Sequence, residues 1–132
     1  MMYRISEKVA KKTKSKIIIN GESIGQVASQ TLTSMYVINN VTNMPVIRPV
    51  ACLDKLEIIE IAKKINTYET SILPYEDCCT IFVPKHPVIN PNLEKCIYNE
   101  SLIDYESMIE ECVNNMEKIN INEYNNNLSN LL

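Results

Sequence analysis

The stretch KIIINGESIGQVASQT, residues 16–31, determines the fold class of the chain. It begins with a run of isoleucines, and a short continuous apolar run is typical of a strand buried on both faces of a parallel sheet. The run ends at Gly21, and the chain's second and last glycine is Gly25. Ser23 and Gln26 have the spacing of a capping box, which predicts a helix that begins directly after the serine. A strand, a glycine and a helix in this order predict an α/β unit.

One helix and one strand are predicted on either side of this stretch. Met2, Ile5 and Val9 recur at helical spacing and predict an amphipathic helix over about residues 2–14. The run PVIRP, residues 45–49, is bracketed by prolines and predicts a second short strand at a strand start or a sheet edge.

Two more helices are predicted towards the C-terminus. Asp54 and Glu57 repeat the cap signal and predict a helix over about residues 54–65. Its buried side chains are expected to be Leu56, Ile59, Ala62 and Ile65, or their neighbours. Apolar residues at helical spacing predict the other helix over about residues 104–118. The order helix, strand, helix, strand, helix predicts an α/β fold with a small parallel sheet.

The helix expected after Gly25 separates apolar from polar positions. Its apolar face is predicted to hold Ile24, Val27, Ala28, Leu32, Met35 and Ile38. Gln26, Gln30 and Ser34 fall four residues apart on a separate polar stripe. Gln30 is therefore predicted to lie outside the core.

Length and composition indicate one soluble intracellular domain. The 132 residues are 45% hydrophobic, and no stretch approaches the roughly 20 apolar residues that cross a bilayer. Five cysteines at irregular spacing argue for reduced thiols rather than a secreted disulfide framework. The domain is expected to span residues 1–118, and the Asn-rich segment 119–132 is expected to fray.

Charge is distributed unevenly along the chain. One arginine and five lysines lie in the first sixteen residues against a single glutamate, whereas residues 94–123 are acidic. A basic cluster of this kind is typical of nucleic-acid contact, but a solvated helix face explains it as well. We favour the solvated face.

Gly21 lies where an open α/β sheet binds ligands, at the carboxyl end of a strand. Without a Cβ it lets a flat ligand such as a nucleobase approach the backbone, and Gln30 is placed to reach the same crevice. The alternative is that both glycines serve only turn geometry. Neither a G-x-G-x-x-G motif nor a Walker A motif is present.

The proline-rich segment over residues 74–91 is predicted to be an ordered loop, because the apolar run TIFV within it argues against disorder. It contains Cys78, Cys79 and the chain's one histidine, His86. His86 is expected to be structural or exposed. No metal site is predicted, because the C-x-x-C spacing of zinc and cluster sites is missing.

Several motifs together resemble one family. GESIGQVASQT, VTNMPVIRP, DKLEIIEIAKKI, TYETSILPYEDCCTIFVPKHP and the opening MMYRISEKVA are similar to the tRNA 4-thiouridine synthetases, also called tRNA sulfurtransferases and tied to thiamine biosynthesis. The resemblance covers residues 1 to about 118 in register. It implies the C-terminal part of an ATP-pyrophosphatase (PP-loop) domain, a partial Rossmann-like parallel sheet of the adenine nucleotide alpha-hydrolase type with its N-terminal strands missing.

The resemblance also implies a chemistry and its residues. In that family ATP, with Mg²⁺, adenylates a tRNA uridine, and a persulfide sulfur then replaces the activated oxygen. Gly21 and Gln30 match nucleotide contacts, and Cys78 matches the sulfur-handling cysteine in an ungapped alignment, with Cys79 matching if one gap is allowed. The alternative for both cysteines is a non-reactive thiol. The implied partners are tRNA and a cysteine desulfurase, in the cytoplasm and without a membrane.

The resemblance stops short of the family's phosphate loop. The motif S-G-G-x-D-S occurs nowhere in the chain, and neither the family's tRNA-binding regions nor its rhodanese domain is matched. Alone, the chain is not expected to catalyse adenylation. We expect it to work with an upstream polypeptide that carries the loop, with self-association as the alternative partner. The other readings are a noncatalytic sulfur carrier or binding module, and an inactive remnant.

Overall fold

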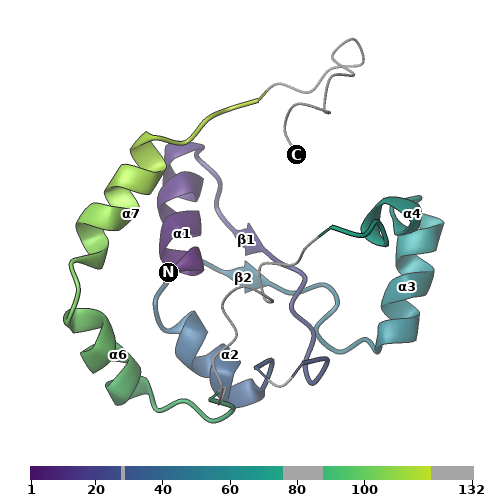
Figure 1. The fold of residues 1–132 in the computed structure, drawn as a ribbon, viewed down its shortest axis with the longest axis horizontal. Helices are drawn as coiled ribbons and strands as arrows, with labels where there is room; N and C mark the ends of the chain where they lie inside the picture. Colours follow the sequence, from purple (N-terminus) through teal and green to yellow (C-terminus); the bar gives the residue numbers. More distant parts are fainter. Residues whose placement is uncertain (28, 76–87, 120–132) are drawn as a thin grey trace.

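The computed structural model describes residues 1–27, 29–75 and 88–119 (Figure 1). Cys78, Cys79, His86 and almost all of the Asn-rich tail therefore lie outside the described residues. The helices and strands are α1 (Met2–Lys12), β1 (Ile18–Ile19), α2 (Leu32–Asn39), β2 (Val46–Ile47), α3 (Lys55–Lys64), α4 (Tyr68–Ser71), α6 (Leu93–Ser101) and α7 (Tyr105–Asn114). None of the described helices is both long and apolar enough to cross a membrane.

The two strands pair in parallel, which confirms the predicted α/β fold with a small parallel sheet. Ile18 lies opposite Val46, and its backbone N–H donates to the carbonyl of Pro45 over 2.9 Å. The expectation that the first strand is buried on both faces is wrong. Ile18 is only 8% exposed but Ile19 is 61% exposed, because no described element covers the outer face of this two-stranded sheet.

Helix α1 joins the sheet to the C-terminal helix, since it contacts both β1 and α7. Lys8 pairs with Glu110 over 3.1 Å, and the Nζ of Lys12 donates to the carbonyl of Val113 over 3.3 Å. Two lysines of the basic segment are thus paired within the molecule, and the solvated helix face stays a prediction. The small core comprises Tyr3, Ala10, Ile18, Val37, Ile109 and Val113.

The buried face of α1 differs from the predicted one. Met2 is 82% exposed, whereas Tyr3 and Ala10, two turns apart, are buried. The reason lies at the strand ends, where the Tyr3 hydroxyl finds polar partners. The helix is therefore rotated so that its aromatic residue faces the sheet.

The predicted helix start after Ser23 is wrong. The Ser23 hydroxyl donates to the carbonyl of Leu53 over 3.0 Å instead of capping a helix, and the N–H of Ile24 donates to the carbonyl of Ala51 over 2.9 Å. Gly25 has φ of 77°, in the left-handed region that interrupts a helix. Residues 21–27, 29 and 30 are thus a loop, held through Ser23 and Ile24 against the segment that follows β2.

Helix α2 begins eight residues later than predicted, at Leu32. The Thr31 side chain accepts a hydrogen bond from the N–H of Ser34 over 3.1 Å and caps it. The later start changes which side chains face the core. Ser34 is buried rather than part of a polar stripe, and Leu32 and Ile38 are exposed rather than buried.

Helix α3 has the predicted capping box. The N–H of Glu57 donates to Asp54 over 2.9 Å, and the N–H of Asp54 donates to Glu57 over 2.8 Å. None of its side chains is fully buried, and Leu56, expected in the core, is 71% exposed. Helix α3 packs on α4, and the pair stands apart from the other helices (Figure 1). We call α3 and α4 together the α3–α4 arm.

Two helices were not predicted, and one prediction extended too far. Helix α4 is a single turn after Thr67. Helix α6 begins after Asn92, whose side chain accepts from the N–H of Lys95 over 2.9 Å. The last predicted helix is confirmed as α7, capped by Asp104, but it ends at Asn114.

Candidate functional site

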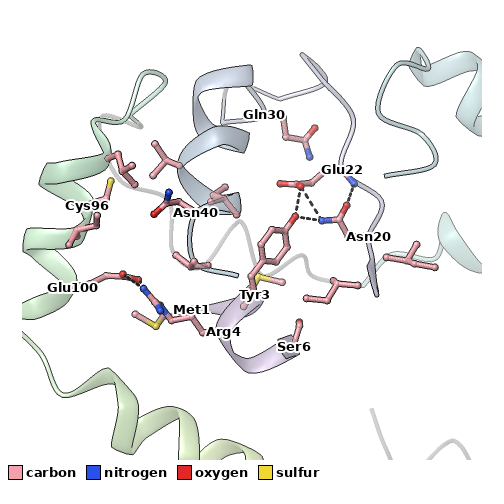
Figure 2. Close-up of a pocket in the computed structure, with 18 of the residues that line it drawn as sticks. Met1, Tyr3, Arg4, Ser6, Asn20, Glu22, Gln30, Asn40, Cys96 and Glu100 are labelled. Carbon is pink, nitrogen blue, oxygen red and sulfur yellow. Dashed lines mark hydrogen bonds and ion pairs between the residues drawn. The ribbon is translucent and has the colours of Figure 1, made fainter. Parts of the chain in front are cut away.

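A pocket of about 780 Å³ opens beside the carboxyl end of β1 (Figure 2). Its walls are the N-terminal turns of α1, the strand β1 with the loop that follows it, α2 and α6. Most of the lining is apolar. One group of polar residues, Asn20, Glu22 and Gln30, lies beside Gly21 where the strand ends, and other polar residues line the helical walls: Arg4, Ser6, Asn40 and Glu100. A pocket of this size and character, mostly apolar with a few convergent polar groups, is typical of small-molecule sites of about 300–1,000 Å³.

Gly21 lines this pocket as an exposed residue, and its glycine identity is not required by the chain itself. A Cβ added at Gly21 would meet no atom of the described residues within 4 Å, and Gly21 is not among the residues with positive φ. Gly25, by contrast, has φ of 77° and needs glycine for its backbone. Turn geometry therefore explains why residue 25 is a glycine but does not explain the glycine at position 21. The open space beside Gly21 is available to a ligand.

Gln30 lines the same pocket from the end of the loop, one residue before the cap of α2. Its backbone is held by two bonds, from its N–H to Val27 over 3.0 Å and from the N–H of Gly25 to its carbonyl over 2.9 Å. Its Oε1 is buried and has no hydrogen-bond partner among the described residues. The structure thus brings Gly21 and Gln30 to one pocket, and their contact with a nucleotide stays a prediction.

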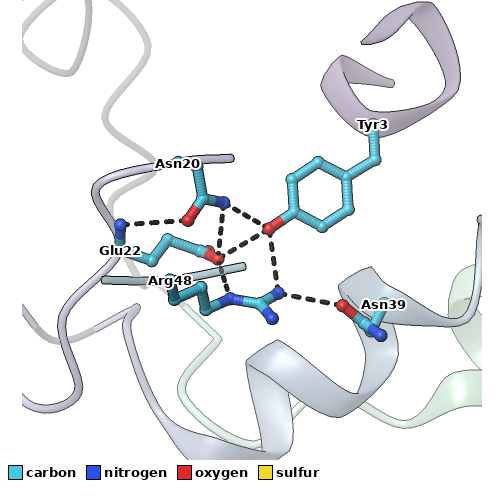
Figure 3. A network of polar contacts seen from close by, with 5 residues as sticks. All are labelled: Tyr3, Asn20, Glu22, Asn39 and Arg48. Carbon is cyan, nitrogen blue, oxygen red and sulfur yellow. Dashed lines mark hydrogen bonds and ion pairs between the residues drawn. The ribbon is translucent and has the colours of Figure 1, made fainter. Parts of the chain in front are cut away.

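Five polar side chains form a network at the ends of both strands (Figure 3), here named the strand-end cluster: Tyr3, Asn20, Glu22, Asn39 and Arg48. The Oε2 of Glu22 accepts from the Tyr3 hydroxyl over 2.7 Å and from the Nε of Arg48 over 2.7 Å. The Nη2 of Arg48 donates to the Tyr3 hydroxyl and to Asn39, each over 2.9 Å. The cluster therefore connects α1, α2 and the segments after both strands.

Asn20 closes the cluster around Gly21. Its Nδ2 donates to Glu22 over 3.0 Å and also to the Tyr3 hydroxyl, and its Oδ1 accepts from the N–H of Glu22 over 3.2 Å. Both chain neighbours of Gly21 are thus tied to each other and to the rest of the cluster.

The cluster keeps Glu22 charged and Tyr3 neutral. Burial alone would raise the pKa of the Glu22 carboxyl, but hydrogen bonds from Arg48, Tyr3 and Asn20 outweigh it and hold that pKa below its usual value. Burial, and next the hydrogen bond to Glu22, raise the pKa of the Tyr3 hydroxyl. The pair Arg48–Glu22 is shielded from water, with side chains 15% and 21% exposed.

A second ion pair fixes the α6 wall of the pocket. Arg4 of α1 donates to Glu100 of α6 over 2.8 Å, and its guanidinium carbon lies 4.7 Å from the centroid of the Tyr105 ring. The hydrogen bond that Arg4 donates to Glu100 raises the pKa of the Arg4 guanidinium. Cys96, half-buried on α6, also lines the pocket and is a free thiol. The predicted sulfur-handling Cys78 and its alternative Cys79 lie outside the described residues.

The residues of the strand-end cluster were not predicted as part of the site. A signal for them exists in the sequence, since Asn20 and Arg48 are the first residues after the two strands. Polar residues at the carboxyl ends of neighbouring parallel strands meet at one edge of the sheet. Tyr3 and Asn39 lie on helices, and only the three-dimensional packing shows their role. Across the described ranges, no three side chains of histidine, cysteine, aspartate or glutamate form a group that could hold a metal ion.

Comparisons with known proteins match the chain over most of its length. The model of a family described as thiamine biosynthesis protein (ThiI) matches residues 1–105. A probable tRNA sulfurtransferase of Staphylococcus epidermidis is 54% identical over 93% of this chain and 30% of its own length. One of Finegoldia magna is 52% identical over 92% of this chain and 31% of its own length. The chain thus spans less than a third of these curated relatives.

A solved structure is similar in fold as well as in sequence. It is the crystal structure of a 4-thiouridine synthetase in a complex with RNA and with bound ATP, and it is 43% identical with a TM-score of 0.79. The similarity covers 88% of this chain and 30% of that one. The agreement supports a partial α/β fold of the nucleotide-binding type.

Proposed function

The chain belongs to the thiamine biosynthesis protein (ThiI) family, and on that premise we propose that it forms the adenine-side half of the ATP site of a tRNA sulfurtransferase. The observation that carries the proposal is the pocket at the end of β1, where Gly21 leaves open space and the lining residue Gln30 has a side-chain acceptor without a partner among the described residues. The structural neighbour with bound ATP supports the choice of nucleotide.

The nucleotide is proposed to bind with its base against the backbone of Gly21. A base is flat, and a backbone without a Cβ admits its face at van der Waals distance. The Oε1 of Gln30 is buried and has no partner among the described residues, so a turn of this side chain towards the pocket would let a ligand N–H satisfy that acceptor. The apolar lining excludes water from the base and strengthens that hydrogen bond.

The proposed reaction has three steps. The O4 of a tRNA uridine attacks the α-phosphorus of ATP, and pyrophosphate leaves. The terminal sulfur of a persulfide then attacks C4 of the uridine, and AMP leaves with the former O4. A second thiol attacks the inner sulfur of the resulting S–S link, which breaks that bond, leaves 4-thiouridine in the tRNA and forms a disulfide. Mg²⁺ would neutralise the phosphates, which calls for residues outside this chain, because its sequence contains no S-G-G-x-D-S motif.

A complementary polypeptide is part of the proposal. The side chains of Ile17 and Ile19 are 40% and 61% exposed, although they belong to the apolar run that forms β1. An apolar strand of a parallel sheet is normally covered, and a free strand edge readily accepts another strand. We expect the sheet to continue from β1 into residues that carry the phosphate loop.

Sulfur handling is assigned to Cys78, with Cys79 as the alternative, and a cysteine desulfurase is the expected donor. The test incubates the protein with a cysteine desulfurase and cysteine and traps the persulfide with an alkylating reagent. We expect the label at residue 78 and its loss in Cys78→Ser, while Cys52→Ser keeps it. A label that survives in Cys78→Ser but is lost in Cys79→Ser would move the assignment to Cys79. Survival in both variants would overturn it.

The nucleotide contact is tested in a chimaera in which this chain replaces the matching 30% of the S. epidermidis relative. Isothermal titration with ATP measures the Kd. Gln30→Ala is expected to weaken binding about tenfold, the effect of losing one hydrogen bond to a buried group. Gln26→Ala is the control, because Gln26 is an exposed residue of the same loop that does not line the pocket. Equal affinity for the Gln30→Ala and parent chimaeras, or no ATP binding by the chimaera, contradicts the proposal.

A further inference from the structure

Arg48 stands behind the wall of the pocket rather than in it. It follows β2 directly, its side chain is 15% exposed, and it is not one of the residues that line the pocket. Its partners Tyr3 and Glu22 do line the pocket. Arg48 is therefore linked to the pocket by its hydrogen bonds to these two side chains.

Glu22 transmits the position of Arg48 to Gly21. The Nε of Arg48 holds the Oε2 of Glu22 over 2.7 Å, and the same oxygen accepts from Asn20 over 3.0 Å. A further bond, from the N–H of Glu22 to the Oδ1 of Asn20, spans Gly21 over 3.2 Å. Gly21 has no side chain of its own to restrain it, so its backbone takes its conformation from these two neighbours.

The guanidinium geometry suits this task. Arg48 donates through Nε to Glu22 and through Nη2 to Tyr3 and Asn39, and so fixes three elements with one planar group. A lysine at the same place would supply the charge but not the fork. Without a cation, the Glu22 carboxylate would turn towards water in the pocket and place its negative charge beside a polyanionic ligand.

We propose that Arg48 is a positioning residue of the nucleotide site, which acts through Glu22 to hold the backbone at Gly21 ready for the base. This inference rests on the proposed function, because it takes Gly21 as the contact point of the nucleotide. The inference goes beyond the proposed function, because it assigns a role to a residue that does not touch the ligand.

The test measures kcat and KM for ATP in the chimaera at saturating tRNA. Arg48→Met is expected to raise KM about tenfold while kcat at saturating ATP changes less than about twofold, because the site is disordered but the reacting groups are intact. The KM for ATP of Arg48→Lys is expected to be close to that of Arg48→Met rather than to that of the parent. Lys8→Met is the control, since its ion pair with Glu110 also anchors α1 but lies outside the pocket.

A double-mutant cycle separates positioning from general destabilisation. If Arg48 acts through Glu22, the variant with both Arg48→Met and Glu22→Gln shows the same KM as the stronger single variant. Effects of the two substitutions that multiply, or an unchanged KM in Arg48→Met, overturn the inference. Should Arg48→Met fail to fold, Tyr3→Phe removes one partner of Arg48 and keeps the ring, and a rise in KM of about threefold is then expected, with no rise overturning the inference.

The outcomes distinguish this inference from the proposed function. ATP affinity that responds to Gln30→Ala but not to Arg48→Met leaves the nucleotide site in place and removes the positioning role. Affinity that responds to neither substitution removes both.

Discussion

The strand-end cluster and the α3–α4 arm are held in place by opposite means. In the cluster, the Tyr3 hydroxyl donates to Glu22, 19 residues away, and accepts from Arg48, 45 residues away. In the arm, the capping box joins residues three positions apart, and α3 has no buried side chain. The arm contacts mainly itself, whereas the cluster connects four segments around the pocket.

This difference indicates that the two regions depend on different kinds of contact. The geometry of the pocket depends on hydrogen bonds between residues that are far apart in the sequence. The arm needs only helical conformation, which local hydrogen bonds supply. Breaking the arm should therefore leave the site intact, and breaking long-range contacts should not.

The largest effect is expected from a proline in the arm. Glu60 is an exposed residue within α3, and Glu60→Pro removes a helical hydrogen bond and clashes with the preceding turn, at a cost of about 3 kcal/mol. Amide hydrogen exchange should show lost protection over residues 55–64 only. Glu60→Ala is the matched control. A higher Kd for ATP in the Glu60→Pro chimaera would show that the arm and the cluster are coupled.

The next effect concerns the loop that carries Gly21. Ser23 is 3% exposed, and Ser23→Ala leaves the carbonyl of Leu53 without its donor, at a cost of about 1–2 kcal/mol. Urea unfolding followed by circular dichroism measures it. Ser101→Ala removes a similar bond on the exposed surface of α6 and should cost less than about 0.5 kcal/mol. If both variants lose the same unfolding free energy, burial of the Ser23 hydrogen bond does not add to the stability of the loop.

Removing the cap of α3 should cost less again. Asp54→Ala loses the acceptor for the N–H of Glu57, and the expected cost is about 1 kcal/mol, confined to the arm. Asp54→Asn keeps an acceptor and should cost much less. Hydrogen exchange of α3 distinguishes the two. An unchanged exchange rate in Asp54→Ala would show that contacts with α4, and not the cap, hold the helix.

The smallest effect is the pH dependence of the cluster. The folded structure lowers the pKa of Glu22 below its ordinary value of 4.5, so its stabilising contribution is complete above that pH and declines as the pH falls through the lowered pKa. The unfolding free energy should therefore decrease in acid, and less steeply in Glu22→Gln. The comparison covers about two pH units around the ordinary pKa of a carboxyl group, from pH 5 to pH 3. If the unfolding free energies of the parent and of Glu22→Gln fall with equal slopes over that range, the stabilising role of the Glu22 carboxylate is contradicted.

The sequence predicted what local chemistry controls. The run of isoleucines and PVIRP became the paired parallel strands, and the capping box at Asp54 and Glu57 became the start of α3. The lysine-rich first helix is α1. Each of these elements depends on side chains that lie within a few residues of one another.

The same motif failed where distant contacts compete with it. Ser23 and Gln26 have capping-box spacing, yet the Ser23 hydroxyl bonds to Leu53, 30 residues away, and Gly25 takes a left-handed conformation. Neither fact is visible in a window of ten residues. For the same reason Arg48 was not recognised, because its partners lie on α1, on α2 and after β1.

The candidate site was predicted in part. Gly21 and Gln30 were singled out by their place after a strand and by family resemblance, and they do line one pocket. The contribution of Tyr3 could not be predicted, since an amphipathic pattern placed Met2 on the buried face. Exposure of Leu56 and Ile19 was also missed, because periodicity indicates which side of an element is apolar but not whether another segment covers it.

The most direct measurement compares alanine at the two glycines in the ATP-binding chimaera. In Gly21→Ala the added Cβ meets no atom within 4 Å in the part of the chain that the structure describes, so the unfolding free energy should stay the same or rise slightly, while the Kd for ATP rises at least about tenfold. In Gly25→Ala, with φ of 77°, stability should fall by about 1–2 kcal/mol. A Gly21→Ala protein that binds ATP as tightly as the parent would contradict the placement of the nucleotide at the end of β1.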